Sequence, residues 1–294
     1  MKNLSGVFTA LITPFKDQKI DFLSLDKLID QQVAGSVDGF VINGTTAESP
    51  TLKTEEREEI YKFIRKKVGT KKTLIFGTGS NDTDRTIQDS IRAQSLGADA
   101  LLVVVPYYNK PPQRGLVKHF SKVASAVDIP VLLYNVPGRT VAALNAESIA
   151  ELSQVKNIVG IKEATGDIQF LKEIKKIAAK DFIYLSGDDG TCVEFLKHGG
   201  HGVISVTAHL FPEAMKKWQR MIAAGQVDEA LVDFGKYKKL TELLFIEANP
   251  IPVKAALKMM NIIKHDELRL PLVALEEKWQ KPIQDELSKL ALLK

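Results

Sequence analysis

The chain has 294 residues, of which 45% are hydrophobic and 26% charged, an ordinary globular composition that excludes disordered and fibrous proteins. Forty Lys and Arg residues against 36 Asp and Glu residues give a net charge of +4 with interspersed signs, which offers no support for binding to nucleic acid or to an anionic membrane. The single cysteine, Cys192, excludes an intrachain disulfide and any multi-cysteine metal site. Because the longest apolar run, 98–106, is far shorter than the ~20 residues of a membrane-spanning helix, we expect a soluble cytoplasmic protein.

Eight short apolar runs, rich in β-branched residues, recur along the chain. They cover residues 6–12, 39–44, 73–77, 98–105, 130–134, 158–162, 182–185 and 202–206. Such nearly continuous runs are typical of strands buried on both faces. Segments with helical periodicity separate them. In one segment Ile60, Ile64 and Val68 share a face, Thr54 is the expected N-cap and Gly69 ends the helix.

Eight strands that alternate with helices through short connections predict a parallel sheet with right-handed crossovers. Eight is also the number of strands that closes a (β/α)8 TIM barrel. An open doubly wound sheet is the alternative, but no G-x-G-x-x-G follows the first run, where a dinucleotide-binding fold would carry it. We therefore predict an α/β protein with a barrel over residues 1–224. Residues 225–294 are expected to form a C-terminal helical appendage packed as part of the subunit, with helices at 227–245, 251–263 and 275–293.

One lysine lies where a barrel of this kind carries its active site, at the C-terminal end of a strand. Lys162 is the only lysine inside a predicted strand, and it can reach bulk water only through the barrel mouth. Burial disfavours the ammonium form of a lysine, and a neutral amine can attack a carbonyl carbon to form a Schiff base. The alternative is a lysine that extends from the strand end to solvent or to a carboxylate.

Hydroxyl and cationic groups follow neighbouring strands. Tyr134 and Tyr108 supply phenols suited to proton transfer, although a tyrosine is also common in a packed core. Thr45 and Thr46 follow the second run and offer a cradle for a carboxylate, or else form an ordinary turn. Arg139 is suited to binding a carboxylate through two hydrogen bonds, or is one of many surface arginines.

The histidines do not predict a metal site. His198 and His201 flank two glycines in the turn before the eighth run, at the barrel end away from the expected site. No strand end combines a histidine pair with a carboxylate, as a metal-dependent aldolase requires. We expect both histidines to be structural.

Seven motifs follow one another in register over essentially the whole chain. They are NGTTAES at 43–49, PYYNKP at 106–111, YNVPGRT at 134–140, GIKEA at 160–164, SGDD at 186–189, GVISV at 202–206 and NPIPVK at 249–254. Together they resemble the dihydrodipicolinate synthase (4-hydroxy-tetrahydrodipicolinate synthase) branch of the pyruvate-dependent class I aldolases. That superfamily also contains N-acetylneuraminate lyase.

The resemblance implies a reaction and roles for individual residues. The reaction is the condensation of pyruvate with L-aspartate 4-semialdehyde to 4-hydroxy-tetrahydrodipicolinate, in the diaminopimelate route to lysine. Lys162 would form the Schiff base with pyruvate, and Tyr134 would carry protons beside it. Thr45 would connect Tyr134 by hydrogen bonds to Tyr108, which would reach in from the neighbouring subunit.

The resemblance also implies substrate-binding residues and an assembly. Thr46 would hold the pyruvate carboxylate, Gly187 and Ile204 would line the pocket with backbone groups, and Arg139 would bind the carboxylate of the semialdehyde. Neither a metal nor an organic cofactor is implied, because the imine itself accepts the electrons. A tyrosine that acts in trans implies a homo-oligomer, which we expect to be a dimer of dimers.

Two other functions stay open. An N-acetylneuraminate lyase or a 2-keto-3-deoxy-acid aldolase would use the same imine with a different acceptor, but sugar-acid lyases generally lack an arginine at the position of Arg139. A binding barrel without turnover is disfavoured because the lysine, both tyrosines and the threonine are all present.

Four positions depart from the pattern of the family, among them Ala248, which stands where a proline often precedes the Asn-Pro. Ala47 stands where glycine is usual, and a positive φ there would strain the turn after the threonines. Arg57 and Arg85 stand where lysine-inhibited members bind the ammonium group of lysine, and like charges repel. The sequence therefore predicts weak inhibition by lysine or none.

Overall fold

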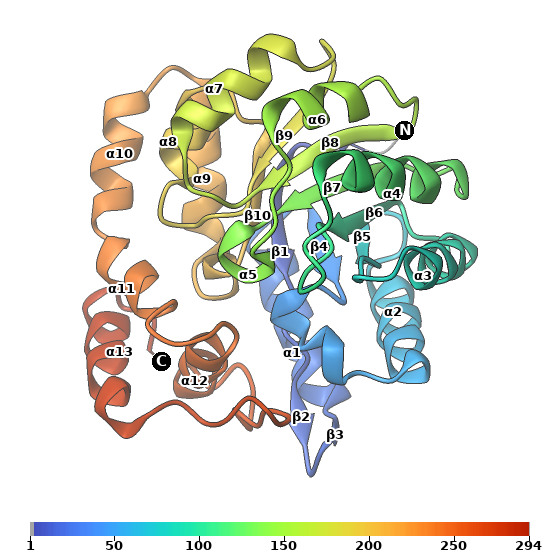
Figure 1. Ribbon diagram of the computed structural model, residues 1–294. Coiled ribbons are helices and arrows are strands. Elements are labelled where there is room, and N and C mark those ends of the chain that lie inside the picture. The colour runs from blue at the N-terminus through green and yellow to red at the C-terminus, as the bar shows by residue number, and fades with distance from the viewer. Residues whose placement is uncertain (1–2, 294) are drawn as a thin grey trace.

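A closed barrel of eight parallel strands, surrounded by helices, dominates the computed structural model, which describes residues 3–293 (Figure 1). The barrel strands are β1 Gly6–Ala10, β4 Gly39–Ile42, β5 Thr73–Gly77, β6 Ala100–Val104, β7 Val131–Asn135, β8 Ile158–Glu163, β9 Ile183–Ser186 and β10 Gly202–Ser205. Each strand pairs with the next in the chain, and β10 pairs with β1 to close the barrel. The predicted (β/α)8 fold is confirmed, since every predicted apolar run lies on one of these strands.

The helices around the barrel are α1 Phe22–Ala34, α2 Thr54–Val68, α3 Thr83–Ser95, α4 Gln113–Ser125, α5 Pro137–Thr140, α6 Ala146–Leu152, α7 Ile168–Ile177, α8 Cys192–Lys197 and α9 Pro212–Ala223, with short 3₁₀ turns η1 Thr45–Ala47, η2 Ser49–Thr51 and η3 Thr207–His209. Four of them, α1, α3, α6 and α7, begin after an Asp or Asn whose side chain accepts an N–H group of the first turn. Asp82 caps α3 and Asp167 caps α7. The predicted N-cap of α2 was wrong, because Thr54 is already helical and the carboxylate of Glu56 accepts the N–H of Lys53 at 2.8 Å.

Two layers of apolar side chains result from the alternation along each strand. On β6, Leu101 and Val103 pack outward in the core between the strands and the helices. Ala100 and Leu102 point into the barrel, in a second cluster that fills its interior. On β7 and β8, too, every second side chain faces the interior. This alternation determines which side chains reach the barrel mouth.

Four further helices follow α9 along one side of the barrel (Figure 1). They are α10 Val227–Gly235, α11 Lys238–Leu243, α12 Ile251–Met259 and α13 Glu277–Lys289. The prediction of one helix over 227–245 was wrong, since the chain turns after Gly235, a residue of low helix propensity. At this turn the ring of Tyr237 packs 4.8 Å from that of Phe211 and 5.2 Å from that of Trp218. The division of the chain at residue 224 stays a prediction.

A small hairpin that the sequence did not predict projects from the barrel after β1. It consists of β2 Phe15–Lys16 and β3 Lys19–Ile20, joined by Asp17 and Gln18, which both have positive φ. The N–H groups of Asp17 and Gln18 donate to the carboxylate of Glu267, at 2.9 and 2.6 Å. A contact with the appendage thus supports a turn that lacks the usual glycine. Because the hairpin contains lysines, Lys162 is the only lysine of the barrel strands rather than of all strands.

His209 connects the ends of the first and last barrel strands. Its Nε2 accepts the N–H of Ile12 at 3.1 Å, and its Nδ1 donates to the carbonyl of Val206 at 2.8 Å. These two bonds require the neutral ring with its proton on Nδ1. Complete burial lowers the pKa of His209 to about 4.

Acidification from about pH 6.5 to about pH 4 is expected to destabilise the fold. In this range the unfolded chain gains a proton on His209 and the folded chain does not, which amounts to about 3 kcal/mol at the acid end. Burial also lowers the pKa of His119 to about 4, so the two residues act in the same direction. Urea unfolding as a function of pH measures the loss.

The variant His209→Gln cannot take up a proton and should therefore show a smaller loss of stability on acidification. His265→Gln is the matched control, because that histidine is exposed. Equal acid sensitivity in the wild type and in His209→Gln would contradict the assignment.

Candidate active site

Lys162 and Tyr134 lie side by side inside the barrel at the C-terminal ends of β8 and β7. The strand register pairs the two residues directly. The Nζ atom of Lys162 lies 4.2 Å from the centroid of the Tyr134 ring, and the lysine is only 7% exposed. No group within residues 3–293 forms a hydrogen bond or an ion pair with this amine. The barrel therefore presents a buried amine that lies against an aromatic ring and has no hydrogen-bond or ion-pair partner among these residues.

Gly187, just after β9, leaves room for the stem of this lysine. A Cβ atom added at Gly187 would lie 2.7 Å from Lys162 Cε and 2.7 Å from Ala164 Cβ. Both distances are shorter than any tolerated contact between carbon atoms, so a side chain at position 187 would displace the lysine. Gly187 thus contributes space in addition to the backbone lining that the sequence predicted for it.

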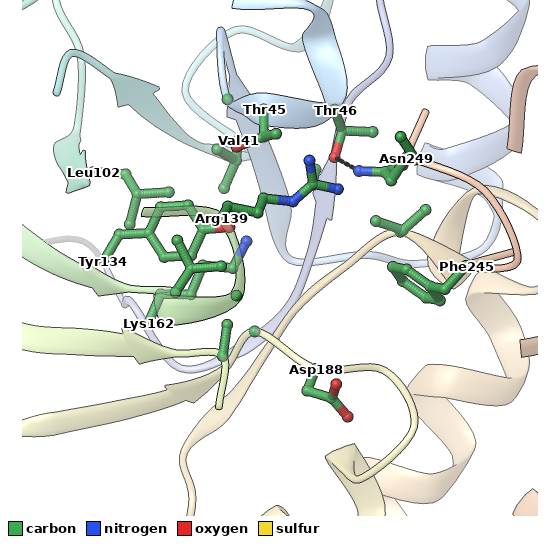
Figure 2. Close-up of a pocket in the computed structure, with 18 of the residues that line it drawn as sticks. Val41, Thr45, Thr46, Leu102, Tyr134, Arg139, Lys162, Asp188, Phe245 and Asn249 are labelled. Carbon is green, nitrogen blue, oxygen red and sulfur yellow. Dashed lines mark hydrogen bonds between the residues drawn. The ribbon is translucent and has the colours of Figure 1, made fainter. Parts of the chain in front are cut away.

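A cavity of about 520 Å³ opens above these residues at the barrel mouth (Figure 2). It brings together six of the eight predicted site residues, namely Lys162, Tyr134, Thr45, Thr46, Arg139 and Gly187. The strand ends of the barrel form its base and part of its wall. The segment 245–249, between α11 and α12, completes the wall.

Two predicted site residues lie outside the wall of this cavity. Ile204 is buried in the cluster that fills the barrel interior, where Tyr134 and Leu185 also pack, so it supports the site from below. Tyr108 is 87% exposed, in the loop after β6, and has a φ of 74°. A tyrosine in the left-handed region is strained, and its ring contributes nothing to the cavity of its own subunit.

Thr45 and Thr46 belong to the turn η1, which forms one wall. The hydroxyl of Thr46 is buried and accepts a hydrogen bond from Nδ2 of Asn249 at 2.8 Å. Thr45 also lines the cavity, and no hydrogen bond within residues 3–293 joins its hydroxyl to Tyr134. The proton relay through Thr45, which includes Tyr108 of a neighbouring subunit, stays a prediction.

The strain expected at Ala47 is absent. The positive φ values of this turn fall on Asn43, at 59°, and on Glu48, at 57°. Ala47 is the last residue of the 3₁₀ turn, and its carbonyl accepts the hydroxyl of Thr13 at 2.9 Å. An alanine therefore fits the turn without left-handed backbone.

Arg139 extends across the cavity from the short helix α5 (Figure 2). Its guanidinium group points toward the wall that carries Thr46 and Asn249. Nothing within residues 3–293 forms a hydrogen bond or an ion pair with it. A solvent-accessible guanidinium without a partner at the mouth of a cavity is suited to binding an anionic ligand.

The sequence did not identify the residues that the appendage contributes to the wall. Phe245 was predicted as the end of a helix, yet it lies in a loop over the cavity. Asn249 was noted only as part of the motif at 249–254, and that motif was the one available signal. Neither residue follows a barrel strand, so its place in the sequence does not indicate a site at the barrel mouth.

A buried ion pair joins the appendage to the threonine turn. Lys254 of α12 is 0% exposed, and its Nζ is paired with the carboxylate of Glu48 and donates to the carbonyl of Glu267 at 2.8 Å. Burial lowers the pKa of Lys254 to about 8, and the charge of Glu48 opposes that shift. The backbone N–H of Arg269 donates to the same carboxylate at 2.9 Å. Two segments of the appendage therefore meet at Glu48, two residues after Thr46.

Two buried carboxyl groups fix the strand ends from outside the barrel. Glu163 accepts hydrogen bonds from Asn135 Nδ2 at 2.9 Å and from the N–H of Thr165 at 2.6 Å, and burial raises its pKa. Asp189 accepts the N–H groups of Val206 and Thr207, and burial raises its pKa as well. Glu163 is engaged through both oxygens and Asp189 through Oδ2, which indicates a structural role.

The histidines named in the sequence prediction lie away from the cavity. His201 accepts the N–H of Tyr184 at 3.0 Å and stacks on its ring, so it serves packing. No group of three or more His, Cys, Asp or Glu residues in the described part of the chain is placed to hold a metal ion. None of the helices within residues 3–293 combines the length and the apolar character that crossing a bilayer demands.

Arg57 and Arg85 line a second, smaller cavity of about 180 Å³ together with Tyr107. Arg57 lies 3.5 Å from Asp89 and donates to the carbonyl of Ser49 at 2.9 Å. Arg85 lies 4.0 Å from the same carboxylate, so both arginines of this cavity flank Asp89. Weak inhibition by lysine or none stays a prediction.

Comparison with known proteins agrees with this geometry. The sequence profile of the dihydrodipicolinate synthetase family matches residues 3–290. The chain belongs to this family. A protein of Bdellovibrio bacteriovorus named 4-hydroxy-tetrahydrodipicolinate synthase is 57% identical over 293 residues, which cover 100% of both chains.

Solved structures of the family share the whole fold. The dihydrodipicolinate synthase of Aquifex aeolicus is 39% identical and superposes with a TM-score of 0.95 over 98% of this chain and 99% of that one. A dihydrodipicolinate synthase variant described as monomeric is 38% identical, with a TM-score of 0.96 over 98% of this chain and 97% of its own.

Replacement of Lys254 by methionine is expected to destabilise the protein strongly. The change leaves the carboxylate of Glu48 buried without its partner, which typically costs about 3–5 kcal/mol. The double variant Lys254→Met/Glu48→Gln should recover most of this loss because it removes the buried charge. Urea unfolding measures both effects.

The matched control is Lys258→Met on the same helix. Lys258 forms an exposed ion pair with Asp266 at 2.8 Å, so its loss should cost less than about 1 kcal/mol. Similar losses in Lys254→Met and Lys258→Met would mean that the Glu48 pair contributes no more than a surface contact.

Proposed function

We propose that this protein condenses pyruvate with L-aspartate 4-semialdehyde to give 4-hydroxy-tetrahydrodipicolinate, in the cytoplasm, on the diaminopimelate route to lysine. The observation that carries the proposal is the buried, unpartnered amine of Lys162 beside Tyr134, at the base of a cavity whose mouth holds the unpartnered Arg139. A relative with 57% identity that is named for this reaction supports the choice of substrates.

The first half of the reaction activates pyruvate. The Nζ atom of Lys162 attacks the carbonyl carbon, and loss of water leaves an imine. The protonated imine draws electrons from the adjacent methyl group, which loses a proton and leaves an enamine. In this proposal Tyr134 carries protons during these steps, and the contact of its ring with Nζ supports that role. The imine accepts the electrons, so the chemistry calls for no cofactor.

The second half joins the two substrates. The enamine carbon attacks the aldehyde carbon of the semialdehyde, and the aldehyde oxygen takes up a proton to become a hydroxyl group. The amino group of the same substrate then attacks the imine carbon and displaces Lys162. This step closes the ring and returns the free lysine amine.

Two walls of the cavity provide for the two carboxylates. Thr46, through its hydroxyl and backbone N–H, holds the carboxylate of pyruvate in this proposal. Arg139 binds that of the semialdehyde, because its guanidinium group extends over the cavity and has no partner among residues 3–293. Gly187 keeps the lysine stem free, and Ile204 packs beneath the site.

The decisive experiment follows product formation from pyruvate and the semialdehyde through a coupled reductase and NADPH oxidation. Turnover is expected in the wild type and should vanish in Lys162→Ala, because the nucleophile is lost. Turnover that survives in Lys162→Ala would contradict the proposal.

Arg139→Ala separates the two substrates in the same assay. It should raise the KM for the semialdehyde by about tenfold or more, since a charged hydrogen bond is lost, while borohydride trapping of the pyruvate imine stays intact. If Arg139→Ala weakened semialdehyde binding and imine formation equally, the arginine would have a structural role. A trapped imine in the wild type without turnover would indicate another acceptor, as in a sugar-acid lyase.

We also propose that Tyr108 acts in the cavity of a neighbouring subunit within a dimer of dimers. Its ring is 87% exposed, lies outside its own cavity and is held in a strained conformation, which suits a group that acts elsewhere. The family includes a variant described as monomeric, and analytical ultracentrifugation distinguishes the two assemblies.

Tyr108→Phe is expected to lower kcat about a hundredfold or more, because proton transfer through a positioned group typically contributes that much. Its sedimentation should match that of the wild type, which we expect to be tetrameric. A fully active monomer in analytical ultracentrifugation would rule out action in trans.

A further inference from the structure

The side chain of Asn249 touches the wall of the cavity from the appendage (Figure 2). Its Nδ2 donates to Thr46 Oγ1 at 2.8 Å across 203 residues of sequence. Its Oδ1 is completely buried and has no donor within residues 3–293. A buried acceptor without a partner is costly, so the amide is retained at the expense of stability.

The hydrogen bond from Asn249 constrains the direction of the Thr46 hydroxyl. A threonine hydroxyl has a single hydrogen to donate and two lone pairs that accept. Asn249 occupies a lone pair, which leaves the hydrogen available for another partner. A carboxylate can only accept, so a hydroxyl that binds it must donate.

A buried ion pair close by fixes the position of Asn249. Five residues further on, Lys254 is locked to Glu48, and Glu48 lies two residues beyond Thr46. The segments 46–48 and 249–254 are therefore joined at both ends, by the amide at one end and by the ion pair at the other. This double attachment holds the amide against the hydroxyl.

We propose that Asn249 is a positioning residue that makes Thr46 a hydrogen-bond donor toward the carboxylate of the keto acid bound to Lys162. The inference rests on the proposed function, since it takes pyruvate as that keto acid. Because Oδ1 of Asn249 is inaccessible, that atom cannot contact the substrate, and the amide acts through Thr46.

The test is a double-mutant cycle on pyruvate binding. Binding is measured by borohydride trapping of the imine, an assay that contains no semialdehyde. The pyruvate concentration for half-maximal trapping is measured in the wild type, Asn249→Ala, Thr46→Val and the double variant. Each single change should raise it about tenfold, since each removes or misdirects a hydrogen bond to a charged group. The double variant should resemble Thr46→Val alone, because Asn249 acts only through that hydroxyl.

Asn157→Ala is the matched control. Nδ2 of Asn157 also donates to the protein, to the carbonyls of Ala124 and Val127 at 2.8 and 2.9 Å, but just before β8, at the opposite end of the barrel. Its half-maximal pyruvate concentration should equal that of the wild type even if its melting temperature falls. If Asn157→Ala raised the half-maximal pyruvate concentration as much as Asn249→Ala does, the proposal would be overturned. The weaker pyruvate binding would then result from lost stability.

Asn249→Asp provides a second route should the alanine variant fold poorly. It preserves the size of the side chain but offers only acceptors. The Thr46 hydroxyl should then donate to this carboxylate instead of to pyruvate, and pyruvate binding should be weaker than in the alanine variant. Unchanged pyruvate binding in Asn249→Asp would overturn the proposal, as would losses that multiply in the double variant. If no imine were trapped in the wild type, both this proposal and the proposed function would be overturned. If an imine formed but the two single changes weakened pyruvate binding independently, this proposal alone would be overturned.

Discussion

The carboxylate of Glu48 is the buried charge through which the appendage is joined to the turn that carries Thr46. It pairs with the fully buried Lys254, accepts the N–H of Arg269 and belongs to the turn that presents Thr46. A buried ion pair seldom adds stability over apolar residues of the same volume, because both charges must leave water. Its value here is geometric, since charge and hydrogen bonds permit only one arrangement of the turn and of α12.

The interior of the barrel imposes the second constraint. A parallel strand sends alternate side chains inward, and most of them fill the space with apolar groups. Lys162 is the exception on β8, and it is tolerated because it lies at the last inward position below the mouth. Its neighbours are an aromatic face and a glycine, which give the amine room without giving it a permanent partner.

The features that the sequence predicted well are those that depend on local patterns. Continuous apolar runs identified all eight strands, because a strand buried on both faces is apolar along most of its length. Lys162 was identified because a lysine in such a run contradicts the pattern. The arginine and the threonines were found because they directly follow strands.

What the sequence did not predict depends on contacts between distant segments. The hairpin at 15–20 relies on Glu267, and the break after Gly235 accompanies ring packing by Tyr237. Asn249 meets Thr46 across 203 residues, a pairing that no local period can indicate. The place of Ile204 beneath the cavity likewise depends on side-chain directions that only the packed barrel defines.

The wall contributed by residues 245–249 has a consequence for the order of folding during synthesis. All eight strands, and with them Lys162, leave the ribosome before this segment does. A barrel that closed early would hold Lys162, Thr46 and Arg139 at a mouth that still lacks one wall. The cavity therefore takes its final shape last, when the C-terminal helices dock and residues 245–249 close that side.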